Sequence, residues 1–408
     1  MKSSPLSVLD AKHMYSIKPY IIVPTLIEQP TWGGSYITSL KGLSGKQWNH
    51  KKIGQSYELF RDSHLSLKNH TLHNPSVDLA QADDPGDPER FYDQDTPFSI
   101  GELIVEDPKK VLGEKVLQEH GHSVEIMIKF TQAKGNSYQV HSQSETENWL
   151  PKPESWYFFE KGLATLGLNP KTDWQEYKRI CGLIYKEAQL ISKAVVQEIL
   201  TLEEGKKSLA ELIEKHNPQD YVNLIQVSKN SAIDLSSGGI HHSWEENPQT
   251  HPHGNILYEV QKNVYDPDCT IRSFDKGKIK ENGSIRELHL DDYFLHIDKH
   301  AQANDPEKYY KKGQILKKTS TQTIKQIFET PDYSLQELTI SSTVSNQFTT
   351  TSSSFHHLFV RQGTLELKVK DSTWKVSQGF SIFIPASMGI YRIRPINGRV
   401  ATVLKTYL

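Results

Sequence analysis

The segment 129–157 carries side chains that could bind a metal ion. Gln139 and His141 lie two residues apart in the pattern Ser-Tyr-Gln-Val-His, which is typical of a β-strand. Side chains two apart in a strand point to the same face, so the amide oxygen and the imidazole would project together. Glu154 comes 13 residues later, beside the apolar run 156–159, which we expect to form a neighbouring strand. These ligand types suit a borderline metal, and a site without sulfur keeps positions open for substrate. The alternative is a polar pair of strands on a surface.

Two adjacent histidines offer a further metal ligand. His241 and His242 follow the turn Ser-Ser-Gly-Gly, whose glycines let the backbone approach a site closely. Only one of two neighbouring residues can face inward on a strand, so one of the pair could complete the ligand set. The chain has 18 histidines, and a surface pair is the alternative interpretation.

Cationic side chains could bind an anion beside these ligands. An Arg272 that faces inward from a strand would need an anion, because burying an unpaired charge is costly. Its guanidinium suits a phosphate or a developing enediolate oxygen, and an ion pair with Asp268 or Glu259 is the alternative. Lys152 lies two residues before Glu154 and could share its face. There it could bind phosphate, or transfer protons if its pKa were lowered; otherwise it is a solvated surface lysine.

The elements that must position these side chains are mostly short strands. Apolar runs broken by turns fill residues 1–60, and alternating runs return after residue 221. Residues 326–408 contain six such runs between turns, a spacing typical of a jelly-roll sandwich or barrel. Residues 61–97 are polar, and we expect a loop insertion there. Residues 300–325 are charged, and we expect a linker or crossing segment.

Residues 170–216 differ in kind from the rest of the chain. Apolar residues recur at intervals of three and four from Ile180 to Leu202, which predicts an amphipathic helix. We expect Gly205 to interrupt this helix and a second helix to begin near Leu209. The pattern therefore predicts a helical subdomain inserted in a strand-rich fold, with its apolar stripe packed into the core.

Composition excludes several classes of protein. A chain of 408 residues allows two or three domains, and a net charge of -2 gives no basic surplus for nucleic acid. Cys181 and Cys269 are the only cysteines, so any metal must use histidine and oxygen ligands. The sequence has no apolar signal region and no run of about 18 apolar residues. We therefore expect a cytoplasmic protein without a membrane span.

Nine segments together resemble the type I mannose-6-phosphate isomerases, which are zinc-dependent enzymes of the cupin superfamily. Each segment is short, but all nine follow the family's order, which makes the set specific. They are Lys18-Pro19, Trp32 to Gly34, Ile53 to Glu58, Ser137 to His141, Lys152 to Tyr157, Gly238 to His241, Glu259 to Gln261, Asp268 to Asp275 and Gly379 to Ala386.

The resemblance implies a mainly β fold with two cupin (jelly-roll) β-barrel domains and an inserted α-helical subdomain. The catalytic cupin would comprise residues 1–169 and 220–325, with the helical insertion at 170–219. A C-terminal cupin-like domain without a metal would comprise residues 326–408. The resemblance also implies one Zn²⁺ per chain, held by Gln139, His141, Glu154 and His241, and it places Arg272, Lys152, Lys129 and Asp268 at active-site positions.

The implied reaction is the interconversion of mannose 6-phosphate and fructose 6-phosphate through a cis-enediol. The implied partner is a small sugar phosphate, with no nucleic acid or membrane, and the implied state is a monomer or weak dimer. The sequence departs from the family pattern at Gln55, Ser142 and Pro151, and about three extra residues precede Asp268. One alternative is therefore a cupin isomerase or epimerase on another sugar phosphate. A sugar-binding cupin without turnover and an iron-dependent cupin oxygenase are the others.

Overall fold

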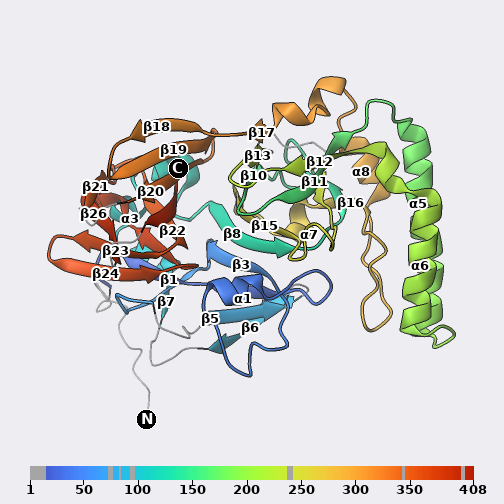
Figure 1. The fold of residues 1–408 in the computed structure, drawn as a ribbon, viewed down its shortest axis with the longest axis horizontal. Helices are drawn as coiled ribbons and strands as arrows, with labels where there is room; N and C mark the ends of the chain where they lie inside the picture. The colour runs from blue at the N-terminus through green and yellow to red at the C-terminus, as the bar shows by residue number, and fades with distance from the viewer. Residues whose placement is uncertain are drawn as a thin grey trace, which may run out of the picture.

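The computed structural model describes residues 15–71, 77–81, 84–91, 97–236, 242–341, 345–396 and 400–408. Within these ranges the chain is mainly β, and its strands form four sheets. Figure 1 shows the sheets at the left and centre of the molecule and two long helices at its right-hand end. The predicted mainly β class is confirmed.

Two of the sheets form the C-terminal unit, at the left of Figure 1. The larger sheet also takes up strands from the N-terminal part of the chain, and one of its strands runs through residue 326. Its order is β18 (Gln314–Lys318), β19 (Gln322–Glu329), β20 (Ser334–Ile340), β27 (Ala401–Tyr407), β22 (His356–Gln362), β25 (Ser381–Ile384), β1 (Tyr20–Val23), β4 (His64–Leu65) and β7 (Phe98–Ser99). The smaller sheet runs β21 (Asn346–Thr349), β26 (Ile390–Pro395), β23 (Thr364–Val369) and β24 (Ser372–Ser377).

The other two sheets form the central unit, which carries the predicted site. The larger one runs β17 (Tyr310–Lys311), β13 (Ala232–Asp234), β10 (Glu154–Phe158), β15 (Asn255–Lys262), β8 (Ile126–Ala133), β3 (Ile53–Leu59), β2 (Thr25–Glu28), β5 (Val77–Gln81) and β6 (Asp84–Phe91). The smaller one runs β12 (Val222–Val227), β11 (Gly162–Leu168), β14 (His242–Trp244), β9 (Tyr138–Val140) and β16 (Ile271–Phe274). Strands β8, β10 and β15 are buried along nearly their whole length, so any charged side chain on them must find its partners inside the protein.

Two segments expected to be irregular contain strands. In the described part of 61–97, β5 pairs in parallel with β2, and β6 pairs antiparallel with β5. In the segment expected to be a linker, β18 pairs with β19. The predictions were wrong there because backbone hydrogen bonds to the open edge of a sheet hold polar segments that lack an apolar alternation.

Along the chain, eight α-helices alternate with groups of strands in the described residues. They are α1 (Tyr36–Leu40), α2 (Ile100–Glu106), α3 (Pro108–Leu112), α4 (Glu114–His120), α5 (Trp174–Val196), α6 (Leu202–His216), α7 (Asp266–Cys269) and α8 (Leu290–His296). The predicted helical segment is confirmed as α5 and α6. The break between them is not at Gly205, however, because Thr201 and Glu204 form a capping box that starts α6 earlier.

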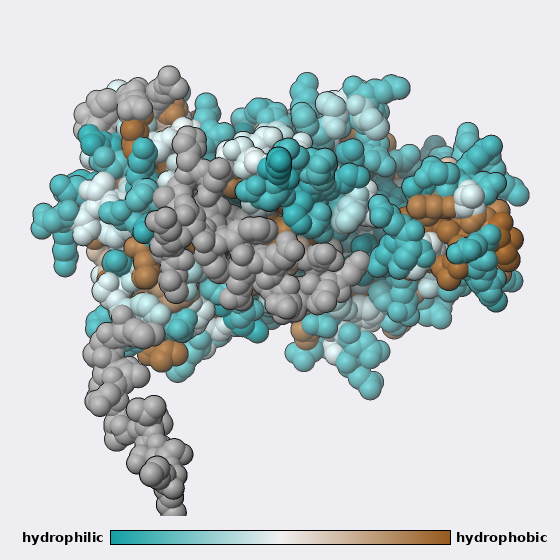
Figure 2. All heavy atoms as spheres, turned by 90° about the horizontal axis from the view of Figure 1, so that it is seen from below, coloured by the Kyte–Doolittle hydropathy of each residue, from teal (hydrophilic) through white to brown (hydrophobic). Residues whose placement is uncertain are grey.

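Gly205 has a packing role inside α6. A Cβ atom at this position would lie 2.5 Å from Cγ2 of Val195 on α5. The glycine therefore lets the two helices approach closely. Figure 2 shows apolar side chains gathered at this end of the molecule, where Leu190, Val196 and Ile199 are more than half exposed. Within the described ranges, no helix combines the length and apolar character needed to cross a membrane.

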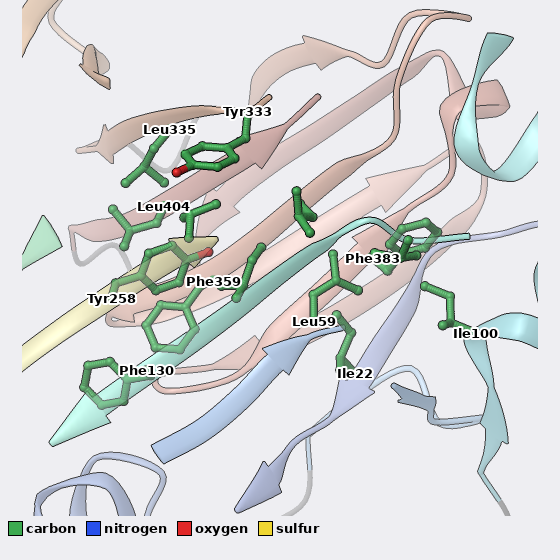
Figure 3. Close-up of a cluster of buried hydrophobic side chains, with 14 of the residues drawn as sticks. Ile22, Leu59, Ile100, Phe130, Tyr258, Tyr333, Leu335, Phe359, Phe383 and Leu404 are labelled. Atoms are coloured by element: carbon green, nitrogen blue, oxygen red, sulfur yellow. The ribbon is translucent and has the colours of Figure 1, made fainter. Parts of the chain in front are cut away.

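One hydrophobic core joins the central and C-terminal units. Figure 3 shows Phe130 of β8 and Tyr258 of β15 packed against Phe359 of β22 and Leu404 of β27. These four side chains are fully buried. Strands β8 and β15, which carry part of the predicted site, therefore pack against the larger sheet of the C-terminal unit.

Candidate active site

Strand β9 presents the first two predicted ligands. Gln139 is paired with His242 of β14 on one side and with Arg272 of β16 on the other. His141 follows directly after the strand, and its exposed fraction is 2%. The Oγ of Ser137 donates a hydrogen bond to Oε1 of Gln139 at 3.1 Å, which fixes the amide with its oxygen toward that hydroxyl. Both side chains lie in the interior of the protein.

His141 and Glu154 meet across two elements. Nδ1 of His141 lies 2.6 Å from the carbonyl oxygen of Cys269, which can only accept, so Nδ1 carries a proton. Nε2 then faces Glu154, 3.4 Å from its Oε1. Two ligands of a tetrahedral zinc ion with bonds of about 2.0–2.1 Å lie about 3.3 Å apart. The two atoms therefore have the separation of neighbouring metal ligands, and the backbone carbonyl orients the ring as in many metal sites.

A network of buried charges lies beside these ligands. Lys152 Nζ is 2.8 Å from Oε2 of Glu154 and 3.5 Å from Oε1 of Glu259. Lys129, directly opposite Glu259 in the β8–β15 pairing, lies 3.7 Å from the same oxygen. Asp266 lies 3.7 Å from Lys152 and 4.0 Å from Lys129. The network therefore holds three carboxylates and two lysines.

The pKa values in this network decide what the lysines can do. Burial opposes their charge, but Glu154, Glu259 and Asp266 together raise the pKa of Lys152 well above its ordinary value. The pKa of Lys129 is also raised, against burial, by Glu259 and Asp266. Both lysines are therefore held as cations, which suits anion binding. The proton-transfer role considered for Lys152 would need the opposite shift.

The structure does not bring Asp268 into this network. Residues 266–269 form α7, and residues two apart on a helix point about 200° away from each other. Asp268 is accordingly exposed, while Asp266 faces the two lysines. Partial burial opposes the charge of Asp266, but Lys129 and Lys152 hold its pKa well below the ordinary value. The sequence resemblance pointed to Asp268, which lies two residues after Asp266 on the same helical turn.

Arg272 reaches the same region from β16. Its Nη1 donates to the carbonyl oxygen of Thr270 at 3.2 Å, and its Nε has no hydrogen-bond partner among the described residues. Within those residues it makes no ion pair, so the predicted alternative of pairing with Asp268 or Glu259 is not observed. Burial and the nearby Arg286 lower the pKa of Arg272. A guanidinium remains charged even so, and its free donor is available to an anion.

Most of these side chains line one pocket in the central unit, but His141 and Asp268 are not among its lining residues. Its lining includes Gln29, Asp266 and Arg286, which the sequence analysis did not select for the site. It also includes Gln55, which the sequence analysis noted only as a departure from the family pattern. No local signal marked Gln29 or Arg286, because their positions depend on strand pairings distant in sequence. The complete lining is Gln29, Trp32, Gln55, Lys129, Asn136, Ser137, Gln139, Lys152, Glu154, Trp156, Trp244, Glu259, Asp266, Arg272 and Arg286.

Three of the four predicted metal ligands lie within the described residues. No group of three or more His, Cys, Asp or Glu side chains placed to hold a metal occurs there. His241, the predicted fourth ligand, lies outside the described residues, as does its Gly-Gly turn. His141, Glu154 and the amide of Gln139 supply a nitrogen and two oxygen donors, which fit a zinc ion with one further histidine.

Comparison with known proteins gives a clear result for the fold. No family model matches the chain, and no curated protein matches it by sequence. Among solved structures, the mannose 6-phosphate isomerase from Bacillus subtilis matches with a TM-score of 0.63 and 17% identity, covering 95% of this chain and 99% of that one. The chain has the fold of these isomerases.

Two further structures support this assignment of the fold. A zinc-bound mannose 6-phosphate isomerase matches with a TM-score of 0.61 at 12% identity, covering 95% of this chain and 99% of that one. A variant of phosphomannose isomerase from Salmonella typhimurium gives the same TM-score, identity and coverage. Sequence identity this low shows the fold alone, and the chemistry of this chain depends on the residues of its own pocket.

Proposed function

We propose that the protein is a metal-dependent aldose–ketose isomerase that interconverts mannose 6-phosphate and fructose 6-phosphate through a cis-enediol. The observation that carries this proposal is the meeting of His141 and Glu154, at the spacing of metal ligands, with two lysines held as cations. The shared fold with mannose 6-phosphate isomerases supports it.

The proposed cofactor is one Zn²⁺ per chain. Gln139, His141, Glu154 and His241 would hold it. Zinc would supply a Lewis acid that polarises the carbonyl and hydroxyl oxygens of the open-chain sugar. Ser137 and the carbonyl of Cys269 would orient two of these ligands through the hydrogen bonds described above.

The chain's own cations would stabilise the negative charge that develops as a proton is moved between C2 and C1. Lys152 lies beside Glu154 and Lys129 beside Glu259, and both could donate to the sugar oxygens without having to gain a proton first. Arg272 would bind the phosphate or the developing oxyanion through its free Nε. The cations of the pocket support a phosphorylated substrate. Lys129, Lys152 and Arg272 all line it, and their positive charges would attract a phosphate group.

We extend the proposal to the architecture. The central and C-terminal units are two cupin barrels. Residues 1–169 and 220–325 form the catalytic barrel except for β1, β4, β7, β18 and the start of β19, which join residues 326–408 in the metal-free barrel; residues 170–219 are the insertion. Strand β15 pairs with β8 on one side and with β10 on the other. This places Lys129 of β8, Glu259 of β15 and Glu154 of β10 on adjacent strands, as expected for a barrel interior.

A coupled isomerase assay of the zinc-loaded protein with mannose 6-phosphate tests the function. We expect turnover that is lost after chelation and returns with zinc. Glu154→Gln should lower kcat/KM about a hundredfold or more and reduce bound zinc measured by mass spectrometry. Glu160→Gln, a surface change outside this pocket, is the matched control and should keep both.

One feature of the pocket favours the alternative function, an isomerase or epimerase acting on another sugar phosphate. Gln55 lines the pocket at a position where the resembling family has a glutamate. Other hexose and pentose phosphates should therefore be assayed in parallel. A folded, zinc-loaded protein that turns over only another sugar phosphate would reject the mannose 6-phosphate claim, and one that turns over none would reject the isomerase.

A further inference from the structure

A second pocket lies between the central and C-terminal units. Its volume is about 320 Å³, at the low end of the range typical of small-molecule sites, which often lie at such junctions. It shares no lining residue with the proposed active site. Strand β10 separates the two, because Glu154 and Tyr157 lie on its opposite faces.

An ion pair between Arg361 and Glu337 lines this pocket, and the hydrogen-bond donors of the arginine are mostly occupied. Nη1 of Arg361 lies 2.8 Å from Oε2 of Glu337 and 2.7 Å from the hydroxyl of Tyr157. Nη2 donates to Oδ1 of Asn230 at 2.5 Å and to the carbonyl of Phe159 at 3.3 Å. The guanidinium therefore has little left to offer an anion, and Glu337 offsets its charge. At the rim, Lys229 is likewise paired with Glu160.

The walls offer neutral donors and acceptors instead. Thr339 of β20 and Thr402 of β27 are direct cross-strand partners, so their hydroxyls stand side by side. Neither side chain has a hydrogen-bond partner among the described residues. Gln378 uses its Oε1 to accept from the amide of Gly363, which leaves its Nε2 as a donor. Tyr36 adds an aromatic wall.

We propose that this pocket binds a neutral polyhydroxylated molecule of monosaccharide size. Paired hydroxyls, an amide donor and an aromatic wall match adjacent sugar hydroxyls and the apolar face of a sugar ring. The offset charges disfavour an anion, so the ligand class differs from the sugar phosphate proposed for the active site. The inference does not depend on the proposed isomerase activity.

Ligand-observed NMR with D-mannose and D-mannitol as neutral probes, and inorganic phosphate as the anionic probe, tests the inference on the full chain. The Glu154→Gln background is used to reduce binding at the active site. We expect saturable binding of at least one neutral probe. Thr339→Val with Thr402→Val should weaken it about tenfold or more, because two hydrogen bonds are lost. Valine suits a strand, so the double variant should fold.

The matched control is Thr373→Val, an exposed threonine on β24 that does not line the pocket; it should leave binding unchanged. Three results would overturn the inference. They are no saturable binding of either neutral probe, neutral binding that is the same in the double variant, and a pocket-dependent preference for phosphate.

Discussion

At the scale of single residues, the site depends on which carboxylates reach the lysines. Glu154 and Glu259 come from buried strands and are almost fully enclosed. Asp266 comes from α7, and 48% of its side chain is exposed, so it is placed where a substrate could also reach. It is also the carboxylate that touches both Lys129 and Lys152 without belonging to the sheet.

We predict that Asp266→Asn and Asp268→Asn will differ sharply in their effect on activity. Removing the charge of Asp266 leaves two buried lysines short of a partner, and we expect kcat/KM to fall about tenfold or more. Asp268 is exposed and points away, so its variant should stay within about twofold of the parent. Steady-state kinetics with mannose 6-phosphate, with thermal unfolding to confirm the fold, measures this. The reverse ranking would restore Asp268 as the active-site carboxylate.

The part of the site that could be predicted from sequence is the part that depends on local strand geometry. Gln139 and His141 were selected together because side chains two apart in a strand point to the same face. Glu154 was found because it opens an apolar strand. Asp266 was missed because it lies on the single helical turn α7, whose place beside the lysines depends on tertiary packing. Arg286 was missed for the same reason.

At the scale of elements, the α5–α6 pair shows how a glycine can serve packing. Periodicity predicted both helices, because an apolar stripe at helical spacing depends only on local sequence. The location of the break was not predictable in the same way. Thr201 and Glu204 cap α6 before Gly205, and the glycine is then used for contact with Val195 of α5.

We predict opposite effects for alanine at the two helical glycines. A Cβ added at Gly182 of α5 would meet only open space, so Gly182→Ala should stabilise the protein by about 0.5–1 kcal/mol. Gly205→Ala would gain the same helical preference but force its Cβ against Val195, so we expect net destabilisation. Urea unfolding measures both. Adding Val195→Ala should relieve the Gly205→Ala contact, and equal stabilisation by both alanines would contradict the packing role.

At the scale of the whole molecule, the two β units share a core that includes buried polar contacts. Lys41 and Glu58 form a fully buried ion pair, and Ser381 of the C-terminal unit donates to the same carboxylate at 2.8 Å. Tyr258 of β15 contacts His357 and Thr406 across the junction, each at 3.1 Å. Sequence patterns indicated none of these cross-junction contacts, because the pairs are separated by 99 to 323 residues.

The buried histidine at this junction should make stability depend on pH. Burial lowers the pKa of His357 to about 3, whereas an unfolded histidine has a pKa of about 6.5. The unfolded state therefore gains a proton first as the pH falls, so the contribution is present above about pH 6.5 and is lost progressively toward pH 3. Between pH 8 and pH 5 this amounts to about 2 kcal/mol of the free energy of unfolding.

We predict that His357→Gln will lower stability at pH 8, because the contact with Tyr258 changes, but will lose about 2 kcal/mol less than the parent on going to pH 5. Urea unfolding at the two pH values measures the difference. His50→Gln, at an exposed histidine, should leave the pH dependence unchanged. If His357→Gln and the parent lose the same free energy, the histidine is not held neutral, and the junction must admit a charged imidazole with water or a carboxylate beside it.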